Sequence, residues 1–548
     1  MSDDFRIVPT LYDREGRPYC ASINSPVSNT VRAKCILPPN KVIPVIFVPG
    51  IMGSNLRGAN GVRHDEIIWR PDDLEWVWEA KDLEPAERQR RYNKNTTRVD
   101  FRAPVDEDLL FDLTGFRSKE INGNWNAEFA RRGWGSVMQG SYAGIMCLME
   151  YHLNRIYHNR QLSGYWRGIL SAQGGARWGV LRGFRRLVEQ ELLRASEYWY
   201  PVHAVGYNWL QSNDLNGRYL AKMIDHYMNR YRRLGYQCSK SILVTHSMGG
   251  LVARAAVHPS MGNAADKVLG VVHGVQPIVG APAAYKRVRA GNEAVGITGL
   301  IAARLLGWSA AEVTPVFAQS PGPLELLPTK RYPRHWLSIT KPNGNAGWRG
   351  EQIVVRALPN ADPYAEIYRE RRAWWRLINE NLIGPARIVD PKITPWNGYL
   401  RNLKRAESFH DKLGNYFHGE TWLHYGADPR QRAWGRVRWK FDGWISGIEN
   451  GVSNQQINNP LIVSDNFIGK VRLQVPTSGR KPLIWSHSIA SAEADGDATV
   501  PHQSGGAAPA SVKFVARMRG FEHQESYDNE NVQSVTLYSI IKIVGKMG

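Results

Sequence analysis

Short apolar runs rich in β-branched residues recur along the chain, each bounded by proline, glycine or polar residues. Runs of this length and composition are typical of strands that are buried on both faces of a sheet. We therefore predict that they form parallel strands of one central sheet. The runs are Lys41–Val48, Val202–Gly206, Ser241–Thr245, Val268–His273 and Lys513–Met518.

A helical spacing of apolar residues separates the second run from the third. Six positions fall on one helix face, and Gly235 follows them as a residue that can end a helix. A second helix is predicted over Val532–Val544, near the end of the chain. This alternation of strands and helices predicts an α/β fold with a doubly wound, mostly parallel sheet. The six positions are Leu220, Met223, Ile224, Tyr227, Tyr231 and Leu234.

Two long stretches, 57–200 and 285–495, do not follow this alternation and are rich in Trp and Arg. We interpret both as insertions that fold over one end of the sheet, the first as a lid or cap and the second as another cap. The core would then be built from 1–56, 201–284 and 496–548. These core segments carry, in that order, a candidate oxyanion loop, a candidate nucleophile, and a candidate acid and histidine.

The stretch SILVTHSMGGLVARAAV, Ser241–Val257, places one serine at a sharp turn between a strand and a helix. Such a turn needs small residues two positions before and two positions after its central residue, and Thr245 and Gly249 meet that need. The pattern predicts that Ser247 is a nucleophile. The alternative is that Ser247 only caps the following helix.

A serine nucleophile needs backbone N–H groups that hold the oxyanion of the acyl intermediate. In this kind of turn one N–H belongs to the residue after the serine, which here is Met248. The loop VPGIMGSNL, Val48–Leu56, follows the first strand, and we expect Ile51 or Met52 to supply the second N–H. The alternative is an ordinary Pro-Gly turn.

The acid and the base of a triad on this fold follow the serine in the order acid, then histidine. The turn ADGDATVPH contains Asp495 and Asp497, of which we take Asp497 as the acid. His523 lies between the last predicted strand and the terminal helix, where the base is expected. His502 and His487 are rival candidates for the base, and a solvated acidic turn with a surface histidine is the non-catalytic alternative.

Together, VPGIMGSNL, THSMGG, DGDATVPH and GFEH resemble the motifs of lecithin:cholesterol acyltransferase-like and GPI-inositol-deacylase-like lipases. The resemblance implies an α/β-hydrolase fold with large lid insertions, a Ser–Asp–His triad with Asp497 as its acid, and hydrolysis of lipid acyl esters. HDEIIWR and WVWEA look like the Trp-bearing lid of that family, which assigns Trp69, Trp76 and Trp78 to a lid that meets the lipid interface. The separation of Ser247 from Asp497 is longer than this family usually has.

Composition narrows the class of protein further. Of the 548 residues, 43% are hydrophobic and 22% are charged, which are ordinary values for a globular protein. No apolar run reaches the roughly 18 to 20 residues of a spanning helix, and MSDDFRIVPT lacks the pattern of a secretory signal. We therefore expect a protein that is made and folded in the cytosol. Its four cysteines have no CxxC spacing, so we expect free thiols and neither a zinc site nor a disulfide framework.

The net charge of +20 and the 20 tryptophans suit a partner that carries phosphate. An anionic membrane surface and nucleic acid are the two candidates, and no helix-turn-helix, zinc-finger or single-strand-binding signature supports nucleic acid. The sequence contains no P-loop, no GxGxxG after a strand and no HExxH motif. We therefore expect no cofactor, with a structural calcium ion in the lid left open.

A basic chain with bulky insertions and no signal peptide also resembles the lipase effectors of bacterial type VI secretion. This second resemblance implies export by a type VI route to the periplasm of a target cell, with a cognate immunity protein and a component of the secretion apparatus as partners. From sequence we infer a serine lipase or A-type phospholipase that acts on membrane lipids. The alternatives are a soluble carboxylesterase or acyltransferase on the same fold, and a non-catalytic basic nucleic-acid-binding protein.

Overall fold

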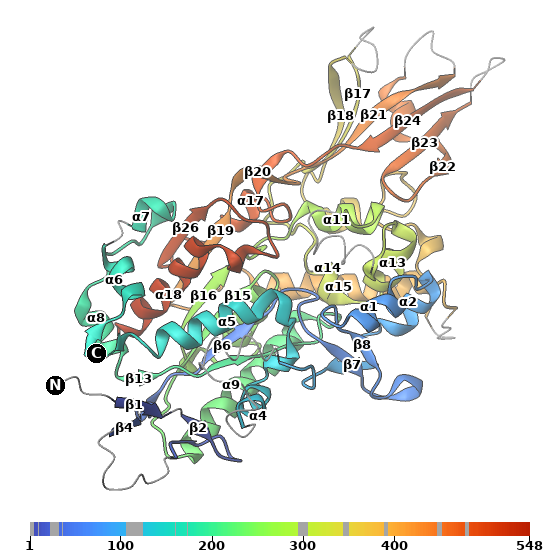
Figure 1. Cartoon of the computed structure of the whole chain (residues 1–548). Helices are drawn as coiled ribbons and strands as arrows, with labels where there is room; N and C mark the ends of the chain where they lie inside the picture. Colours follow the sequence, from blue (N-terminus) through green and yellow to red (C-terminus); the bar gives the residue numbers. More distant parts are fainter. Residues whose placement is uncertain are drawn as a thin grey trace.

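A central sheet with helices on both faces forms the body of the molecule, and a second sheet stands out from it (Figure 1). This arrangement comes from a computed structural model of the chain. The structure describes residues 5–8, 10–21, 32–35, 37–105, 124–158, 160–171, 174–293, 305–343, 350–387, 393–446, 452–476 and 482–547.

Seven strands form the central sheet, and all but one edge strand run parallel to their neighbours. In the order in which they pair, the strands are β12 (Val180–Arg182), β26 (Phe514–Met518), β19 (Thr421–Gly426), β16 (Val268–Gly274), β15 (Ser241–His246), β6 (Val45–Val48) and β14 (Val202–Ala204). The antiparallel edge strand is β12. Each of the five predicted runs contributes a strand to this sheet, and the α/β-hydrolase fold class is confirmed.

Helices cover both faces of the central sheet. They are α5 (Gln139–Leu153), α8 (Glu189–Ala195) and α18 (Glu530–Val544) on one face, and α9 (Asn213–Arg233) and α10 (Gly249–Val257) on the other. In β6, Ile46 and Val48 join the hydrophobic layer with α9 and α10, while Val45 and Phe47 join the layer with α5 and α18. Both faces of β6 are buried, and all four of its residues are apolar. This continuous apolar run is why the strand could be predicted from the sequence.

The helix predicted between the second and third runs is α9. It begins after Ser212, whose hydroxyl accepts a hydrogen bond from the Asp214 N–H (3.3 Å). It ends just before Gly235, which has a φ of +90°. The apolar stripe faces the sheet, with Leu220 and Tyr231 fully buried. The helical prediction and its end are therefore confirmed.

The predicted division into core and insertions needs two corrections. Strand β12 lies within 57–200 and strand β19 lies within 285–495, yet both belong to the central sheet. The sequence of β19, TWLHYG, is buried throughout, but it contains Thr, His and Gly among its apolar residues and gives no continuous apolar run. The helices α5 and α8 also come from 57–200 and cover a face of the sheet rather than its end.

The N-terminal part of the first insertion forms a small sheet and two short helices over one end of the central sheet. The strands are β7 (Leu56–Gly58), β8 (Ile67–Trp69) and β9 (Thr97–Val99), and the helices are α1 (Leu74–Ala80) and α2 (Pro85–Arg91). We call residues 64–80 the lid segment, because they contain both predicted lid motifs. Helix α2 packs against α13 (Ala310–Ala318) of the second insertion, so the two insertions meet.

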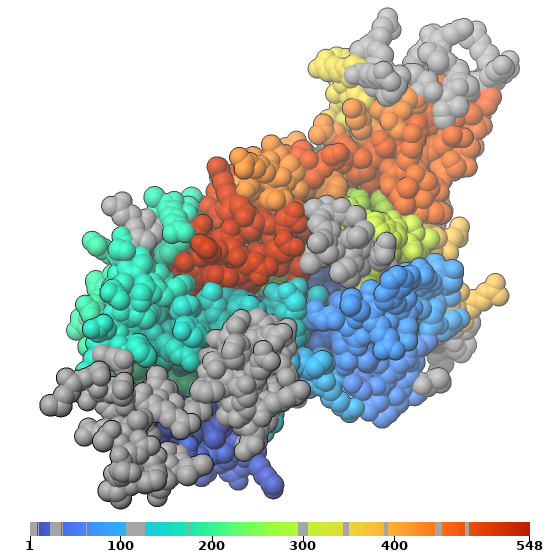
Figure 2. Space-filling model, viewed as in Figure 1, coloured from blue at the N-terminus to red at the C-terminus, as the bar shows by residue number. Residues whose placement is uncertain are grey.

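The second insertion supplies a six-stranded sheet that projects from the body (Figures 1 and 2). Its strands, in pairing order, are β18 (Gln352–Leu358), β17 (Leu337–Pro342), β21 (Val437–Ser446), β24 (Leu483–Ile489), β23 (Lys470–Val475) and β22 (Leu461–Asp465). Helix α11 (Pro282–Ala290) packs against β21 of this sheet, α13 packs against α11, and α15 (Pro395–Leu413) packs against α13.

Several two-stranded pairs and short helices complete the described structure. The pairs are β1 (Phe5–Val8) with β4 (Arg32–Cys35), β2 (Leu11–Tyr12) with β3 (Pro18–Tyr19), β5 (Lys41–Val42) with β13 (Tyr198–Trp199), β10 (Tyr157–His158) with β11 (Gln161–Leu162), and β20 (Asp428–Ala433) with β25 (Ala494–Gly496). The short helices are α4 (Asn124–Arg131), α6 (Gly164–Ser171), α7 (Gly174–Arg177), α14 (Pro321–Leu324), α16 (Asn454–Asn458) and α17 (His502–Gly505). Within the described residues, no helix combines the length and the apolar character that crossing a membrane requires.

Candidate active site

Ser247 lies at the sharp turn between β15 and α10, with a φ of +51° in the left-handed region. The turn requires glycine at position 249, because a Cβ there would clash with the carbonyl oxygens of Val48 and Pro49 at the end of β6. The N-cap residue of α10 is Met248, and no side chain caps this helix. The predicted strand, turn and helix are therefore present, and Ser247 is not the helix cap.

His523 and Asp497 lie beside Ser247 in a hydrogen-bonded chain. The Ser247 hydroxyl is 2.8 Å from His523 Nε2, and His523 Nδ1 is 2.9 Å from Asp497 Oδ2. A carboxylate can only accept, so the proton of the neutral imidazole is on Nδ1 and Nε2 is free to accept from the serine. The structure thus brings together the three residues that the sequence proposed as a triad.

The turn that carries Asp497 fixes its carboxylate firmly. Asp497 Oδ1 accepts hydrogen bonds from the N–H groups of Thr499 (3.2 Å) and Val500 (2.7 Å), while its backbone carbonyl accepts from the His523 N–H (2.8 Å). The intervening Ala498 has a φ of +68°, which turns the chain back on itself. The buried carboxylate is therefore aimed at the imidazole by its own loop.

The rival residues lie elsewhere. His487 is buried in β24, where its ring bonds with the Thr340 carbonyl (2.9 Å) and with Trp485 Nε1 (3.1 Å). His502 Nδ1 is 3.1 Å from the carbonyl oxygen of Asp495, whose carboxylate pairs with arginines. Neither histidine has a hydrogen bond to Ser247 among the bonds of the described residues.

A second hydrogen-bonded group, which no sequence motif indicated, lies beside the triad. His246 Nε2 donates to the backbone carbonyl of His523 (2.8 Å), and its Nδ1 is 3.1 Å from the hydroxyl of Tyr142 in α5. The same hydroxyl accepts from the Gly50 N–H (3.2 Å) and from the Gln524 amide (3.3 Å). One tyrosine hydroxyl therefore connects the oxyanion loop, the serine turn and the histidine loop.

The protonation state of this group is fixed by burial. Burial, with a smaller effect of the His523 charge, lowers the pKa of His246 to about 3, and burial raises the pKa of Tyr142 to about 12. Both side chains are consequently neutral at ordinary pH. The His246 ring donates from Nε2 and accepts the Tyr142 O–H at Nδ1.

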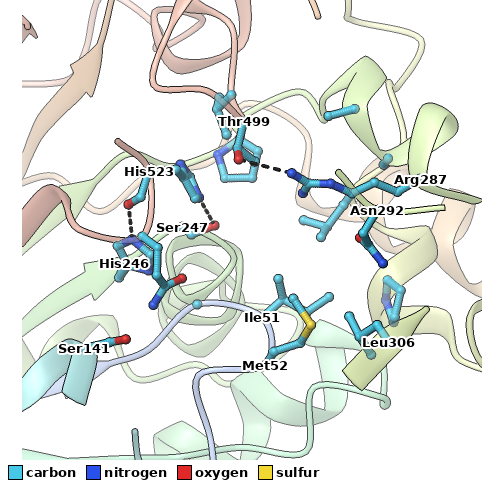
Figure 3. Close-up of a pocket in the computed structure, with 18 of the residues that line it drawn as sticks. Ile51, Met52, Ser141, His246, Ser247, Arg287, Asn292, Leu306, Thr499 and His523 are labelled. Carbon is cyan, nitrogen blue, oxygen red and sulfur yellow. Dashed lines mark hydrogen bonds between the residues drawn. The ribbon is translucent and has the colours of Figure 1, made fainter. Parts of the chain in front are cut away.

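The predicted oxyanion donors lie around the serine. Met52 has a φ of +64°, and its carbonyl accepts a hydrogen bond from Trp69 Nε1 (2.6 Å). Ile51, Met52 and Ser247 line one cavity (Figure 3). Among the backbone hydrogen bonds of the described residues, the N–H groups of Ile51, Met52 and Met248 have no acceptor. These groups are thus available to a ligand, and their catalytic role stays a prediction.

The cavity above Ser247 has a volume of about 350 Å³ and is mainly apolar. One wall comes from the oxyanion loop and the lid segment, and another comes from the second insertion. Apolar lining residues include Ile51, Met52, Trp69, Pro277, Leu305, Leu306, Phe317 and Leu326. Polar lining residues include Asp72, Ser141, Arg287, Asn292, Glu293, Thr499, Glu522 and Gln524.

Comparison with known proteins agrees with this geometry. The family model for lecithin:cholesterol acyltransferase matches residues 199–346. The solved structure described as "The crystal structure of Tle4-Tli4 complex" is 31% identical, covers 92% of this chain and 99% of that chain, and superposes with a TM-score of 0.74. The chain belongs to the Tle4 family. No curated protein matches it in a sequence search.

Membership of the Tle4 family sets the general function. Together with the lecithin:cholesterol acyltransferase match, it makes the chain a lipase or phospholipase and an effector of the type VI secretion system. The class of reaction is acyl-ester hydrolysis or acyl transfer. The nucleic-acid-binding alternative is thereby set aside.

The three tryptophans of the lid segment lie in different environments in this Tle4-family chain. Trp69 and Trp76 are buried, and the Trp69 ring packs edge-on against Trp76 and Trp209. Trp78, by contrast, is 66% exposed, with Lys81 Nζ 3.7 Å from its ring centroid. In this structure only Trp78 of the three tryptophans is exposed, and their assignment to a lid that meets the lipid interface stays a prediction. Strand pairing of β8 and the inner face of α1 direct Trp69 and Trp76 into the core.

Sequence reasoning missed most of the cavity wall. Leu305, Phe317 and Arg287 come from the second insertion, where the sequence offered no motif that points to the serine. Tyr142 lies in the first insertion on a helix without any recognisable signal. Of the cavity residues, Thr499 could have been indicated in advance, because it lies two positions after Asp497.

Proposed function

We propose that this Tle4-family protein is a serine hydrolase of the phospholipase A type, which cleaves acyl esters of membrane phospholipids. The observation that carries the proposal is the unbroken chain from the Ser247 hydroxyl through His523 to Asp497, placed at the floor of an apolar cavity. An apolar cavity suits an acyl chain, and a serine activated in this way attacks esters.

In the proposed reaction, His523 Nε2 takes the Ser247 hydroxyl proton as the serine oxygen attacks the ester carbonyl. The backbone N–H of Met248 and that of Ile51 or Met52 hold the oxyanion. The imidazolium then protonates the departing glycerol oxygen and leaves an acyl-serine. Water, deprotonated by the same imidazole, releases the fatty acid and restores the serine.

The alternative within the same reaction class is a soluble carboxylesterase or an acyltransferase. An acyltransferase would pass the acyl group from Ser247 to an alcohol instead of water. The apolar wall at Leu305, Leu306 and Phe317 supports a long acyl chain over a short soluble ester. Product analysis separates these possibilities, because transfer yields a new ester and hydrolysis yields a free fatty acid.

We also propose that the reaction needs no cofactor, because the steps above use only side chains and backbone groups of this chain. Hydrolysis should then continue in a chelator such as EDTA. A loss of activity in EDTA that calcium restores would instead assign a structural ion to the protein.

We further propose that the protein has a cognate immunity protein, is delivered by a component of the type VI apparatus, and acts at an anionic membrane surface in the periplasm of a target cell. The structure of the Tle4–Tli4 complex supports the immunity partner, and the net charge of +20 supports the anionic surface.

The central test uses the purified protein and its Ser247→Ala variant on phospholipid vesicles, with products identified by mass. We expect free fatty acid and lysophospholipid from the wild type and neither from the variant. A fluorophosphonate should label the wild type at Ser247. Labelling at another serine, or full activity of the variant, would refute the proposed nucleophile.

A further inference from the structure

One basic side chain reaches into the cavity. Arg287, on α11, is the only arginine or lysine among the described residues that line it. Its Nε and Nη2 donate to Glu293 Oε1 (3.1 and 3.0 Å), and Nη2 also donates to the Thr499 hydroxyl (3.3 Å). Thr499 belongs to the same turn as the acid Asp497. Arg287 thus lies next to the catalytic group without being part of it.

The charge around Arg287 is positive overall. Glu293 is shared by two cations, because its other oxygen accepts a hydrogen bond from Lys286 Nζ (2.7 Å). Burial raises the pKa of Glu293, but the charges of Arg287 and Lys286 outweigh that effect and hold its pKa below the ordinary value. Glu293 is therefore ionised, and the three side chains together carry a net charge of +1.

This positive group lies on a different side of the cavity from Ile51 and Met52 of the oxyanion loop. Figure 3 shows the Arg287 side chain extended toward Thr499, on the side of Ser247 that carries the acid turn, while Ile51 and Met52 lie on the other side. The Nη1 atom of Arg287 has no acceptor in the hydrogen bonds of the described residues. An arginine with one free edge beside a hydroxyl can bind a phosphate through charge-assisted hydrogen bonds.

Two further carboxylates line the cavity, Asp72 and Glu522. Asp72 already accepts the N–H groups of Gln139 (2.6 Å) and Gly140 (3.2 Å), at the start of α5. These carboxylates repel an anionic group that enters the cavity. Among the described residues that line the cavity, only Arg287 carries a permanent positive charge that can attract it.

We propose that Arg287, with the Thr499 hydroxyl, binds the phosphate of a glycerophospholipid headgroup and thereby selects phospholipids over neutral glycerides. The inference rests on the proposed function, since it assumes that the ester is cleaved at Ser247. Beyond the proposed function, it states which part of the substrate headgroup is bound, a phosphate oxygen, and which residue binds it, Arg287. The acyl chain would lie against the apolar wall while the phosphodiester lies at the Arg287 end.

The test compares Arg287→Gln with the wild type on three substrates. These are phosphatidylglycerol, diacylglycerol with the same acyl chains, and 4-nitrophenyl butyrate, the two lipids being presented in the same nonionic micelles. We expect kcat/KM on phosphatidylglycerol to fall about tenfold or more, because a charge-assisted hydrogen bond is lost. Activity on diacylglycerol and on the butyrate ester should stay within about twofold of the wild type. Arg287→Lys should give an intermediate value on phosphatidylglycerol, since it keeps the charge and loses the planar geometry.

A matched control is Arg218→Gln on α9, which removes another arginine paired with a carboxylate, Asp214 (2.7 Å), outside the residues that line the cavity. This control should leave the ratio of the two lipid activities unchanged. Equal losses of Arg287→Gln on all three substrates would overturn the inference and make Arg287 a support of the acid turn. An unchanged ratio between the lipids would overturn it as well, while butyrate hydrolysis that depends on Ser247 would leave the proposed function standing. Absence of ester hydrolysis in the wild type would refute the proposed function itself.

Inorganic phosphate distinguishes a lipid-borne phosphate from a free one. We expect that phosphate leaves butyrate hydrolysis unchanged, because the free ion lacks the acyl chain that holds the headgroup in place. Competitive inhibition by phosphate in the wild type but not in Arg287→Gln, without a preference for phosphatidylglycerol, would assign the site to a free anion and overturn the proposal.

Discussion

At the scale of single residues, the orientation of His523 is decided by the Asp497 carboxylate that accepts its Nδ1 proton. In Asp497→Asn an amide replaces that acceptor, so the imidazole can adopt the wrong tautomer, and kcat should fall by about 10³ to 10⁴. His523→Ala should cause a loss of at least the same order. Initial rates on a butyrate ester measure both effects.

The double variant is the control for this pair. Because the two residues act as one unit, its loss should be close to the larger of the single losses. If the free-energy losses of the two single variants added up in the double variant, the residues would act independently and the triad would be the wrong description.

Tyr142 gives a second prediction at this scale. Tyr142→Phe keeps the ring but leaves the Gly50 N–H and the His246 Nδ1 without their partner. Since each such bond contributes about 0.5 to 1.5 kcal/mol, kcat should fall about tenfold with little change in KM. Tyr227→Phe is the matched control, because that hydroxyl is also buried and bonds to two carbonyls outside the cavity. A similar loss of kcat in both variants would reduce the role of Tyr142 to general stability.

A residue of the site is easier to predict from the sequence when the residues that it contacts lie close to it in the chain. Ser247 was predictable because the demands of the turn fall on its immediate neighbours, such as Gly249. Tyr142 and His246 are 104 positions apart in the chain, and Arg287 and Thr499 are 212 positions apart. No local pattern encodes such a pair, so these residues emerged only from the structure.

At the scale of elements, α1 presents two different faces. Trp76 packs into the core, while Leu74 and Trp78, four positions apart, are 73% and 66% exposed. Trp76→Ala should lower the free energy of unfolding by about 3 to 5 kcal/mol, seen as a lower melting temperature. Trp78→Ala should leave the melting temperature unchanged but reduce hydrolysis of vesicle lipid more than hydrolysis of a soluble ester, because an exposed apolar face contacts the interface.

The charged residues of α1 indicate how the lid segment would contact a membrane. Glu75 and Glu79 accompany Trp78 on this short helix, so attraction of the lid segment to an anionic surface cannot be electrostatic. Equal losses of Trp78→Ala on vesicle and soluble substrates would show that α1 does not contact the membrane. Because α1 carries these acidic residues, the electrostatic attraction of the +20 net charge to an anionic membrane has to come from other faces of the molecule.

Elements were predictable where burial on both faces forces a uniform pattern. β6 and β15 are buried at every position, and their apolar runs identified them. β19 is also buried throughout, but its Thr421 hydroxyl bonds to the His418 carbonyl (2.7 Å) and its polar residues interrupt the run. β12 is short and lies at the edge of the sheet with exposed residues, so no apolar run marks it.

At the scale of the whole molecule, a set of buried histidines ties stability to pH. Burial is the main cause that lowers their pKa, while the ordinary value in an unfolded chain is about 6.5. The unfolded state therefore binds more protons than the folded state below about pH 6.5, and stability falls as the pH decreases toward the folded values. The values are about 3 for His246, His273 and His424, and about 4 for His152, His410 and His487.

We expect the melting temperature to be constant above about pH 7 and to fall steeply between about pH 6 and pH 4, with each histidine contributing up to about 1.4 kcal/mol per pH unit. His424→Phe removes one of these groups from a fully buried position and should make the decline shallower. A melting temperature that stays constant down to about pH 4 would contradict the assignment of these side chains as neutral in the folded state.

The triad also has a consequence for the order in which the protein becomes active during synthesis. The serine turn is complete once α10 has been made, but Asp497, β26 and His523 are translated about 240 residues or more later. β26 lies in the sheet between β12 and β19, so the sheet is complete only when this later segment has been made. A nascent chain on the ribosome therefore has a nucleophile without a base. The producing cell therefore meets an active enzyme only after the segment from Asp497 to His523 has been made and has folded against the serine turn.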